Sequence, residues 1–306
     1  PIENSLAELW SIFDFLMPQY LFNYHYFQKQ YENDIVKNND EEKTKQLKKL
    51  VTPFILRRNK KEVLTELPDK IEQNIILPFN DEEEKLYVAN LAEANKELQE
   101  LYDLEGSDKM QILKLLTRLR QLCLEPRLVY DNIDQPSSKL KACMELIKTM
   151  QENKQKVLLF SSFTSVLDLI AEECQKAGIT YYMLTGSTNK EDRRELVSRF
   201  QKDDTTVFLI SLKAGGTGLN LTSAEAVIHF DPWWNVSAQN QATDRAYRIG
   251  QKNNVQVFNL VMKDSVEEKI IELQKRKKEL ADMFVENNSG GLSQMSKEDI
   301  LSLFTM

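Results

Sequence analysis

From residue 136 onward, the sequence alternates short apolar runs with longer amphipathic segments. The run Val157–Phe160 is apolar without interruption, which is typical of a strand buried on both faces of a parallel sheet. The segments between such runs have helical spacing over about ten to fifteen residues, so each strand connects to the next through a helix. The expected fold of residues 136–265 is therefore α/β, a doubly wound parallel sheet with helices on both faces.

Periodicity and strand-breaking residues set the expected bounds of these elements. Gly178 stops one helix, and Ser138 is placed to cap another. Because ligands bind at the carboxyl ends of parallel strands, the residues that follow the strands are the candidates for a functional site. The expected strands are 156–161, 181–184, 206–211, 226–230 and 255–261, and the expected helices are 139–151, 165–176, 189–201 and 238–247.

The first 135 residues have helical spacing and few signals for strands. Apolar residues from Leu6 to Leu16 recur at steps of three and four, and helices are expected over 80–104 and 112–124. Asn80 and the acidic residues after it suit the first turn of the longer helix. We expect this part to be largely helical, and we expect a further charged helix over 267–286.

The composition excludes several classes of site. Hydrophobic residues make up 42% and charged residues 28% of the 306 residues, which is typical of a folded soluble chain. With three cysteines, two histidines and no C-x-x-C pair, neither a metal site nor a disulfide framework is expected. No apolar run approaches the roughly 18 residues of a membrane-spanning helix, so no membrane contact is expected. The net charge is −7, with −5 in residues 1–150 and −2 in the remainder, so nucleic-acid contact requires a local basic stripe.

A glycine-rich turn follows the expected strand 206–211. Gly215, Gly216 and Gly218 lie within four positions, and glycines let backbone N–H groups approach a phosphate closely. The spacing alone fits a tight structural turn equally well. No G-x-x-x-x-G-K-[ST] motif occurs in the sequence, so this turn is not a Walker A loop.

A second cluster follows the expected strand 226–230. If residues 239–247 are helical, Gln241, Arg245 and Arg248 share one helical face. Two guanidinium groups at the ligand edge of a sheet suit the oxygens of a transferring γ-phosphoryl group. The alternative is a solvated face on which Asp244 pairs with Arg248.

These two clusters are part of a resemblance that extends over most of the chain. The string QNQATDRAYRIGQ (239–251), with LISLKAGGTGLN (209–220) before it, resembles motifs V and VI of the Swi/Snf family of DNA-dependent ATPases in helicase superfamily two. LRRNKKEVLTELPDKIE (56–72) resembles the linker between the two motor lobes of that family, and VLLFSSFTSVLDLI (157–170) resembles motif IV. The resemblance implies that residues 136–265 form the second RecA-like lobe of the motor.

The resemblance also implies a division of the chain. Residues 1–79 correspond to the end of the first lobe, a helical insertion and the linker between lobes, and residues 80–135 to a helical protrusion of the second lobe. Residues 136–265 are the RecA-like helicase C-terminal lobe, and residues 266–306 are a brace helix and tail. The first lobe, with its Walker A and Walker B motifs, is missing from the sequence, so we expect no appreciable ATPase activity from this chain alone.

In that family, two lobes enclose ATP with Mg²⁺, and the second lobe supplies arginines to the transition state. The resemblance implies that Arg245 and Arg248 are arginine fingers. It assigns nucleotide contacts to Gly216, Gly218, Asn220 and Gln241.

The resemblance further implies contacts with the phosphate backbone of double-stranded DNA, which position a protein without reading sequence. For the two serines that end the strand 156–161, strand-end capping is the alternative, and a single exposed lysine can simply be solvated. The implied DNA-binding residues are Ser161, Ser162, Phe163, Thr185, Gly186, Ser187, Lys213, Gly215 and Trp234.

The function expected is that of the C-terminal motor lobe of an ATP-dependent DNA translocase, with duplex DNA and its own first lobe as partners. One alternative is a non-catalytic scaffold that docks proteins on its acidic helical half. Another is a strand-separating helicase, although such a helicase is not expected to carry the linker at 56–72. The protein client is left open, and a prokaryotic source with a cytoplasmic or nucleoid location is expected over a nuclear one.

Overall fold

The computed structural model describes residues 6–38, 40–55, 68–103, 109–215, 219–284 and 303–304. The chain divides into two compact units. The first unit comprises Pro1–Glu66, Trp234–Ser237 and Leu273–Ser296, and the second comprises Leu67–Trp233, Ala238–Glu272 and Lys297–Met306. No helix within the described ranges is long and apolar enough to span a membrane.

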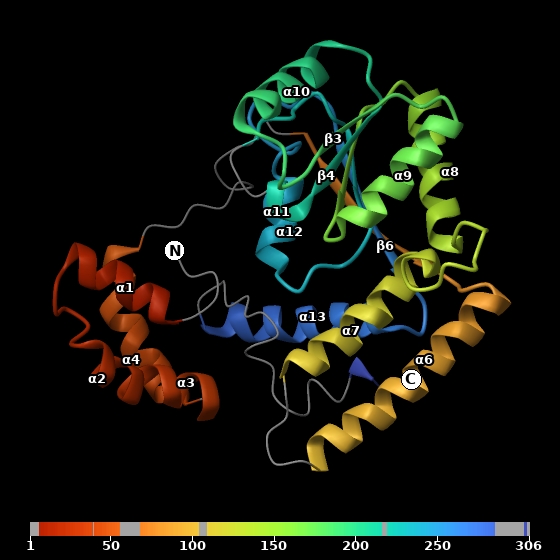
Figure 1. The fold of residues 1–306 in the computed structure, drawn as a ribbon. Coiled ribbons are helices and arrows are strands. Elements are labelled where there is room, and N and C mark those ends of the chain that lie inside the picture. Colours follow the sequence, from red (N-terminus) through yellow and green to blue (C-terminus); the bar gives the residue numbers. More distant parts are fainter. Residues whose placement is uncertain are drawn as a thin grey trace. The chain divides into compact units, whose positions relative to one another are not determined.

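The second unit is built around one six-stranded sheet in which every pairing is parallel (Figure 1). The strand order across the sheet is β1-β6-β5-β2-β4-β3. The expected doubly wound α/β fold is therefore confirmed. The strands are β1 (Lys70–Leu77), β2 (Val157–Ser161), β3 (Tyr181–Leu184), β4 (Val207–Ser211), β5 (Ala226–His229) and β6 (Val255–Met262).

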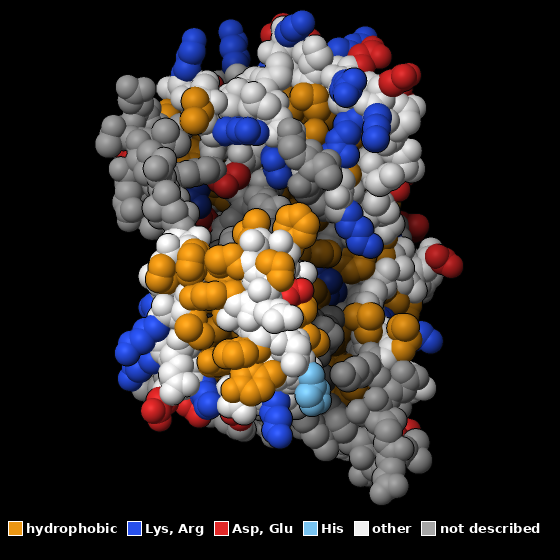
Figure 2. Space-filling model, turned by 90° about the vertical axis from the view of Figure 1, so that its left-hand side faces the viewer, with side chains coloured by type: hydrophobic (Ala, Val, Ile, Leu, Met, Phe, Trp, Pro, Cys, Tyr) orange, Lys and Arg blue, Asp and Glu red, His pale blue; other side chains and the backbone are white. Residues whose placement is uncertain are grey.

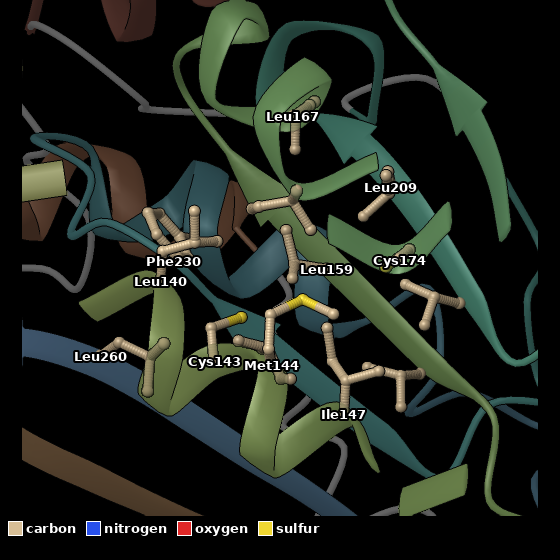
Figure 3. Close-up of a cluster of buried hydrophobic side chains, with 14 of the residues drawn as sticks. Leu140, Cys143, Met144, Ile147, Leu159, Leu167, Cys174, Leu209, Phe230 and Leu260 are labelled. Atoms are coloured by element: carbon tan, nitrogen blue, oxygen red, sulfur yellow. The ribbon is translucent and has the colours of Figure 1, made fainter. Parts of the chain in front are cut away.

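Helices cover both faces of this sheet because the central strands are apolar on both sides. Every residue of β2 and β4 is buried. Leu159 and Leu209 pack with residues of α8 and α9 on one face (Figure 3), whereas Leu158 and Phe208 pack with residues of α10, α11 and α12 on the other. The helices are α8 (Ser138–Glu152), α9 (Thr164–Lys176), α10 (Lys190–Lys202), α11 (Leu212–Gly215) and α12 (Val236–Thr243).

Strand β1 lies within the first 135 residues, which were expected to be largely helical and for which no strand was predicted. It pairs in parallel with β6, from Lys70 opposite Val255 to Leu77 opposite Met262. As an edge strand it is largely exposed, with Ile71 and Ile76 each 45% exposed, so its sequence lacks the continuous apolar run of a central strand. The two compact units divide at residues 66 and 67, just before this strand.

Two long helices, α6 (Asp81–Asp103) and α7 (Lys109–Leu124), precede α8. Asn80 caps α6 as expected, since its side chain accepts hydrogen bonds from the N–H groups of Glu82 and Glu83, both at 3.0 Å. The cap of α8 differs from the expectation, because Ser137 and not Ser138 accepts the N–H of Leu140, at 3.0 Å. A short 3₁₀ turn, Pro126–Leu128, follows α7.

The first unit is helical. Its core contains Leu9, Phe13 and Phe27, and Figure 2 shows apolar side chains gathered on one face of the surface. Phe15 is 86% exposed and Leu16 is 66% exposed. The elements are α1 (Leu6–Leu16), α2 (Tyr24–Phe27), a π-helical turn (Gln28–Glu32), α3 (Asn33–Asn38), α4 (Glu41–Val51) and a 3₁₀ turn (Thr52–Phe54), and α13 (Val266–Phe284) begins in the second unit.

Candidate functional site

Most of the predicted site residues belong to the second unit. Those that the structure describes follow the carboxyl ends of strands or lie on helix α12 and in the turns after it. Residues 161–163 end or follow β2, 185–187 follow β3, 213–215 follow β4, and α12 comes after β5. The strand order places β4 and β5 on either side of β2, so the chain reverses its direction of winding there. Ligands of doubly wound sheets bind at this point.

Helix α12 is shorter than the sequence predicted, and this corrects the geometry expected for the two arginines. It ends at Thr243, and turns follow, with the N–H of Ala246 bonded to the Thr243 carbonyl at 3.1 Å. Only Gln241 therefore lies on the helix, where it is half-buried, and Arg245 and Arg248 extend from the turns. The helical i, i+4, i+7 face does not exist in the structure.

His229 holds the C-terminal end of α12 against the sheet. Its Nε2 lies 2.9 Å from the Thr243 hydroxyl oxygen, and that hydroxyl donates to the carbonyl of Gln239 at 3.3 Å. The ring stacks on Phe160 with a centroid distance of 5.7 Å. Burial lowers the pKa of His229 to about 4, so the imidazole is neutral at pH 7. Because the Thr243 hydroxyl donates its hydrogen to Gln239, the tautomer that fits carries its hydrogen on Nε2 and donates it to Thr243.

Arg245 lies in a region of concentrated positive charge. Its side chain is half-buried, whereas Arg248 is exposed. Burial lowers the pKa of Arg245, the neighbouring Arg248 and Arg193 guanidinium groups lower it further, and Asp244 opposes them. The two sequence-predicted arginines are thus brought together, and a bound anion would relieve their repulsion.

Arg193 on α10 is a member of this cluster that sequence reasoning missed. Its Nη2 donates to the carbonyl of Ala214, at the start of the glycine-rich segment. The available signal was its position on the helix that follows Thr185-Gly186-Ser187 at the ligand edge of the sheet.

The glycine-rich segment is the part of the chain from Ala214 to Leu221, which contains the glycine-rich turn. Its two described ends, 214–215 and 219–221, are bonded to neighbouring elements, while Gly216 and Gly218 lie outside the described residues. Gly215 is buried, and a Cβ there would lie 3.1 Å from the ring of Phe160, so a side chain at this position would require the buried ring to shift by a few tenths of an ångström. At the other end, the N–H of Leu221 donates to the carbonyl of Arg245 at 2.9 Å. Asn220 is exposed, and its carbonyl accepts from Gln201 at 2.7 Å.

Asp231 organises the turn after β2. Its carboxylate accepts the Ser161 hydroxyl at 2.7 Å and the Ser162 N–H at 3.0 Å, and it also accepts the Ser162 hydroxyl. Ser161 is fully buried, and its hydroxyl oxygen in turn accepts the N–H of Phe163 at 3.1 Å. The strand-end capping considered as an alternative for the two serines is therefore present, and their contact with DNA stays a prediction.

Arg120 on α7 completes this network from outside the strand ends. Its Nη2 lies 2.9 Å from Asp231, 2.9 Å from the Ser162 hydroxyl and 3.4 Å from the Pro232 carbonyl. The guanidinium carbon lies 5.0 Å from the ring centroid of Phe163. Sequence reasoning identified neither Arg120 nor Asp231, and no local pattern connects them, because they are 111 positions apart.

The remaining DNA-binding candidates differ in exposure. Gly186, Ser187 and Lys213 are exposed, and the Thr185 and Ser187 hydroxyls lie 2.8 Å apart. Trp234 is half-buried and belongs to the first compact unit. In the upper part of Figure 2, at the height of α10 in Figure 1, Lys and Arg side chains outnumber Asp and Glu side chains. Among the residues that the structure describes, no three His, Cys, Asp or Glu side chains are grouped as metal ligands would be.

Two family models match the chain. The model described as "SNF2-related domain" matches residues 1–128, and the model described as "Helicase conserved C-terminal domain" matches residues 138–250.

Individual proteins and structures are similar over almost the whole chain. A Mycoplasma pneumoniae protein described as an uncharacterized ATP-dependent helicase is 38% identical over 99% of this chain and 29% of its own length. The ISWI chromatin-remodeling complex ATPase ISW1 of Saccharomyces cerevisiae is 33% identical over 99% of this chain and 28% of its own length. The chain thus spans less than a third of these relatives.

A solved structure supplies the match in three dimensions. The Sulfolobus solfataricus SWI2/SNF2 ATPase core in complex with dsDNA is 33% identical, with a TM-score of 0.64 over 99% of this chain and 64% of that one.

Proposed function

Since the chain belongs to the Swi/Snf family of ATPases, we propose that it is the second motor lobe of a protein that moves along double-stranded DNA at the expense of ATP. The observation that carries this proposal is the cluster of Arg245 and Arg248 beside the glycine-rich segment, at the ligand edge of the sheet.

In this proposal, Arg245 and Arg248 contact the γ-phosphate of ATP and stabilise the negative charge that its oxygens carry in the transition state. ATP, bound with Mg²⁺, supplies the phosphoryl group that is transferred to water. The fit rests on charge, because burial and Arg248 both lower the pKa of Arg245 and an anion would offset both effects. Nucleotide contacts of Gln241 and Asn220, and of Gly216 and Gly218, belong to the same proposal.

The first lobe would hold the Mg²⁺ and the remaining phosphates. The sequence contains no Walker A motif, so this chain alone would not hydrolyse ATP. The proposed activity therefore belongs to the protein in which this chain is joined to a first lobe.

DNA contact in this proposal is made by exposed groups at the same edge. Lys213, Ser187 and the backbone of Gly186 are exposed and can reach phosphate oxygens. Phe163, Ser162 and Thr185 would shape this surface, and the lack of a side chain at Gly215 would let the protein backbone approach a strand of the DNA. Support comes from the Sulfolobus relative, whose ATPase core was solved in complex with dsDNA.

The test is ATP turnover by the two-lobe protein, measured with and without duplex DNA. We expect DNA to stimulate turnover, and we expect Arg245→Ala to lower it by about 10³–10⁵-fold. Arg199→Ala is the matched control, because Arg199 is an exposed arginine that forms an ion pair with Glu195 of its own helix, at 3.5 Å. Turnover that is indifferent to DNA, or unchanged by Arg245→Ala, contradicts the motor function and favours the scaffold alternative.

A second measurement separates a translocase from a strand-separating helicase. The two-lobe protein is expected to displace a third strand from a DNA triplex while leaving a forked duplex paired. ATP-dependent separation of the forked duplex would favour the helicase alternative.

A further inference from the structure

Two neighbouring residues of the sheet hold helix α12 at successive turns. Asn259 of β6 and His229 of β5 lie opposite each other in the parallel register. The Nε2 of His229 lies 2.9 Å from the Thr243 hydroxyl oxygen, and the Nε2 of Gln239 donates to the Oδ1 of Asn259 at 3.0 Å. Gln239 and Thr243 are four positions apart, so both face the sheet from one side of the helix. Two attachments one turn apart fix the rotation of α12 as well as its position.

The hydrogen bonds of the two amides run in one direction, from the backbone before α12 to the edge strand β1. The N–H of Trp233 donates to the Oε1 of Gln239 at 3.3 Å. At the other end, the Nδ2 of Asn259 donates to the Oε1 of Glu72 at 3.2 Å and to the Oδ1 of Asn74 at 2.9 Å. A backbone N–H can only donate and a carboxylate can only accept, so the orientation of both amides between them is determined.

The end of this chain at β1 is a carboxylate. Partial burial raises the pKa of Glu72, but the hydrogen bond and charge of Lys70, 3.0 Å away, and the hydrogen bond from Asn259 hold the pKa below its usual value. Glu72 is therefore ionised at neutral pH and accepts a charge-assisted hydrogen bond, which is stronger than one between neutral groups. Because Asn259 is only 8% exposed, water cannot readily replace the partners of its amide.

The last turn of α12 carries the backbone of Arg245. The N–H of Arg245 donates to the carbonyl of Ala242 at 3.1 Å, and the N–H of Tyr247 donates to the carbonyl of Thr243 at 3.1 Å. Ala242 and Thr243 follow Gln239 within about one turn of the same helix. A rotation of α12 on the sheet would therefore move the point from which the Arg245 side chain extends.

We propose that Asn259 is a positioning residue that, through Gln239, sets the orientation of α12 and with it the placement of Arg245. This inference rests on the proposed function and adds a residue to it. Asn259 contacts neither ATP nor DNA in that function and acts only through α12. Its loss leaves the Arg245 guanidinium displaced from the γ-phosphate, and a displacement of about 1 Å can lower a rate by about 10²-fold.

The experiment measures ATP turnover by the two-lobe protein at saturating duplex DNA over a range of ATP concentrations. Asn259→Leu keeps the branched shape of the side chain and removes its hydrogen-bonding groups. This variant is expected to lower kcat by about 10–100-fold while the KM for ATP changes less than about twofold, because the arginine acts on the charge of the transition state. Urea unfolding gives the folded fraction of each variant, and kcat is expressed per folded molecule, so a loss of stability alone leaves it unchanged.

The control is a second amide of the same strand. Gln256 is three positions from Asn259 on β6, so its side chain lies on the other face of the sheet, away from α12. Gln256→Leu is expected to change kcat by less than about twofold.

A double-variant cycle tests whether Asn259 acts through Gln239. Gln239→Leu removes the other partner of the same hydrogen bond and is expected to lower kcat in the same way. Asn259→Leu combined with Gln239→Leu is expected to lose no more activity than Gln239→Leu alone, because the bond is already absent. Losses that multiply would show that the two residues act independently, which overturns the inference.

A rescue variant restores the chain of hydrogen bonds with the carboxylate moved from one residue to the other. Asn259→Asp keeps an acceptor for Gln239 but sets a second carboxylate against Glu72, so it is expected to lower kcat. Adding Glu72→Gln removes this repulsion and supplies an amide donor to the carboxylate at position 259, so kcat is expected to return to within about threefold of the unaltered protein. Recovery of stability without recovery of kcat contradicts the positioning role.

The outcomes distinguish this inference from the proposed function. If Asn259→Leu keeps its kcat while Arg245→Ala is inactive, the positioning role is wrong and the motor function stands. Equal losses in Asn259→Leu and Gln256→Leu also overturn the positioning role. If Arg245→Ala is fully active, the motor function fails and takes the positioning role with it.

Discussion

The buried imidazole of His229 predicts a specific dependence of stability on pH. The group is fully buried, and burial lowers its pKa from 6.5 to about 4, while Glu72 and Asp231 raise it and Lys70 lowers it. In the unfolded chain the imidazole takes up a proton as the pH falls through 6.5, whereas in the folded chain it stays neutral until about pH 4. The unfolded state therefore binds more protons in this window, and stability falls as the pH is lowered.

The size of the effect follows from the two pKa values. At pH 5, protonation of the unfolded imidazole lowers the free energy of unfolding by about 2 kcal/mol relative to pH 7.5, and below pH 4 the loss levels off at about 3.4 kcal/mol. Other groups titrate in the same range, so the measurement must isolate His229. His229→Gln does so, because an amide can donate to Thr243 and does not titrate.

The assay is urea unfolding of the chain, followed by far-ultraviolet circular dichroism from pH 7.5 to pH 5. The difference in unfolding free energy between the unaltered chain and His229→Gln should change by about 2 kcal/mol across this range. Loss of stacking on Phe160 adds an offset that does not depend on pH. His25→Gln is the control, because it removes an exposed imidazole of the first unit. A difference that stays constant within about 0.5 kcal/mol would refute the argument that His229 is buried in its neutral form.

Two further predictions concern buried groups of the second unit. Lys139→Met should lower the free energy of unfolding in the same urea assay by about 3–5 kcal/mol, because it leaves the buried Glu267 carboxylate without the ammonium group that lies 2.6 Å away. The control, Lys141→Met at an exposed site of the same helix, should change this free energy by less than about 0.5 kcal/mol. The thiols of Cys123, Cys143 and Cys174 should resist a thiol reagent in the native chain at pH 8 and react fully in urea, because burial raises the pKa of each, to about 12 for Cys174. Fast labelling of the native chain would contradict this.

The sequence predicted the central strands well because burial on both faces leaves a simple signal. The expected strands 156–161 and 206–211 each differ by one residue from the fully buried strands β2 and β4. Strand β1 carried no such signal. Half of its surroundings are solvent, and its pairing with β6 depends on residues about 185 positions away, as in the contact between Asp69 and Asn254.

The end of α12 was missed because a tertiary contact decides it. The residues 244–247 have no strong helix breaker, so periodicity extends the helix to Tyr247. In the structure, the carbonyl of Arg245 accepts the N–H of Leu221 at 2.9 Å, and the backbone turns after Thr243. The arginines were identified from their types and from the family resemblance, whereas their placement required the segment that precedes β5.

Burial separates the groups that build this edge of the sheet from those that can meet a ligand. Asp231, His229 and Ser161 are almost fully buried. Asp231 accepts the Ser161 hydroxyl, and His229 Nε2 bonds the Thr243 hydroxyl, so burial makes these hydrogen bonds costly to break. Arg248 and Lys213 are exposed, and their long side chains leave the charge in water. For the proposed function, a rigid support with exposed cationic side chains suits a site that binds phosphate repeatedly, since the strong electrostatic attraction is kept for the ligand and little reorganisation is needed when it binds. Substitutions in the buried set should therefore lower stability and activity together, whereas substitutions of the exposed cations should lower phosphate contact and leave the fold intact.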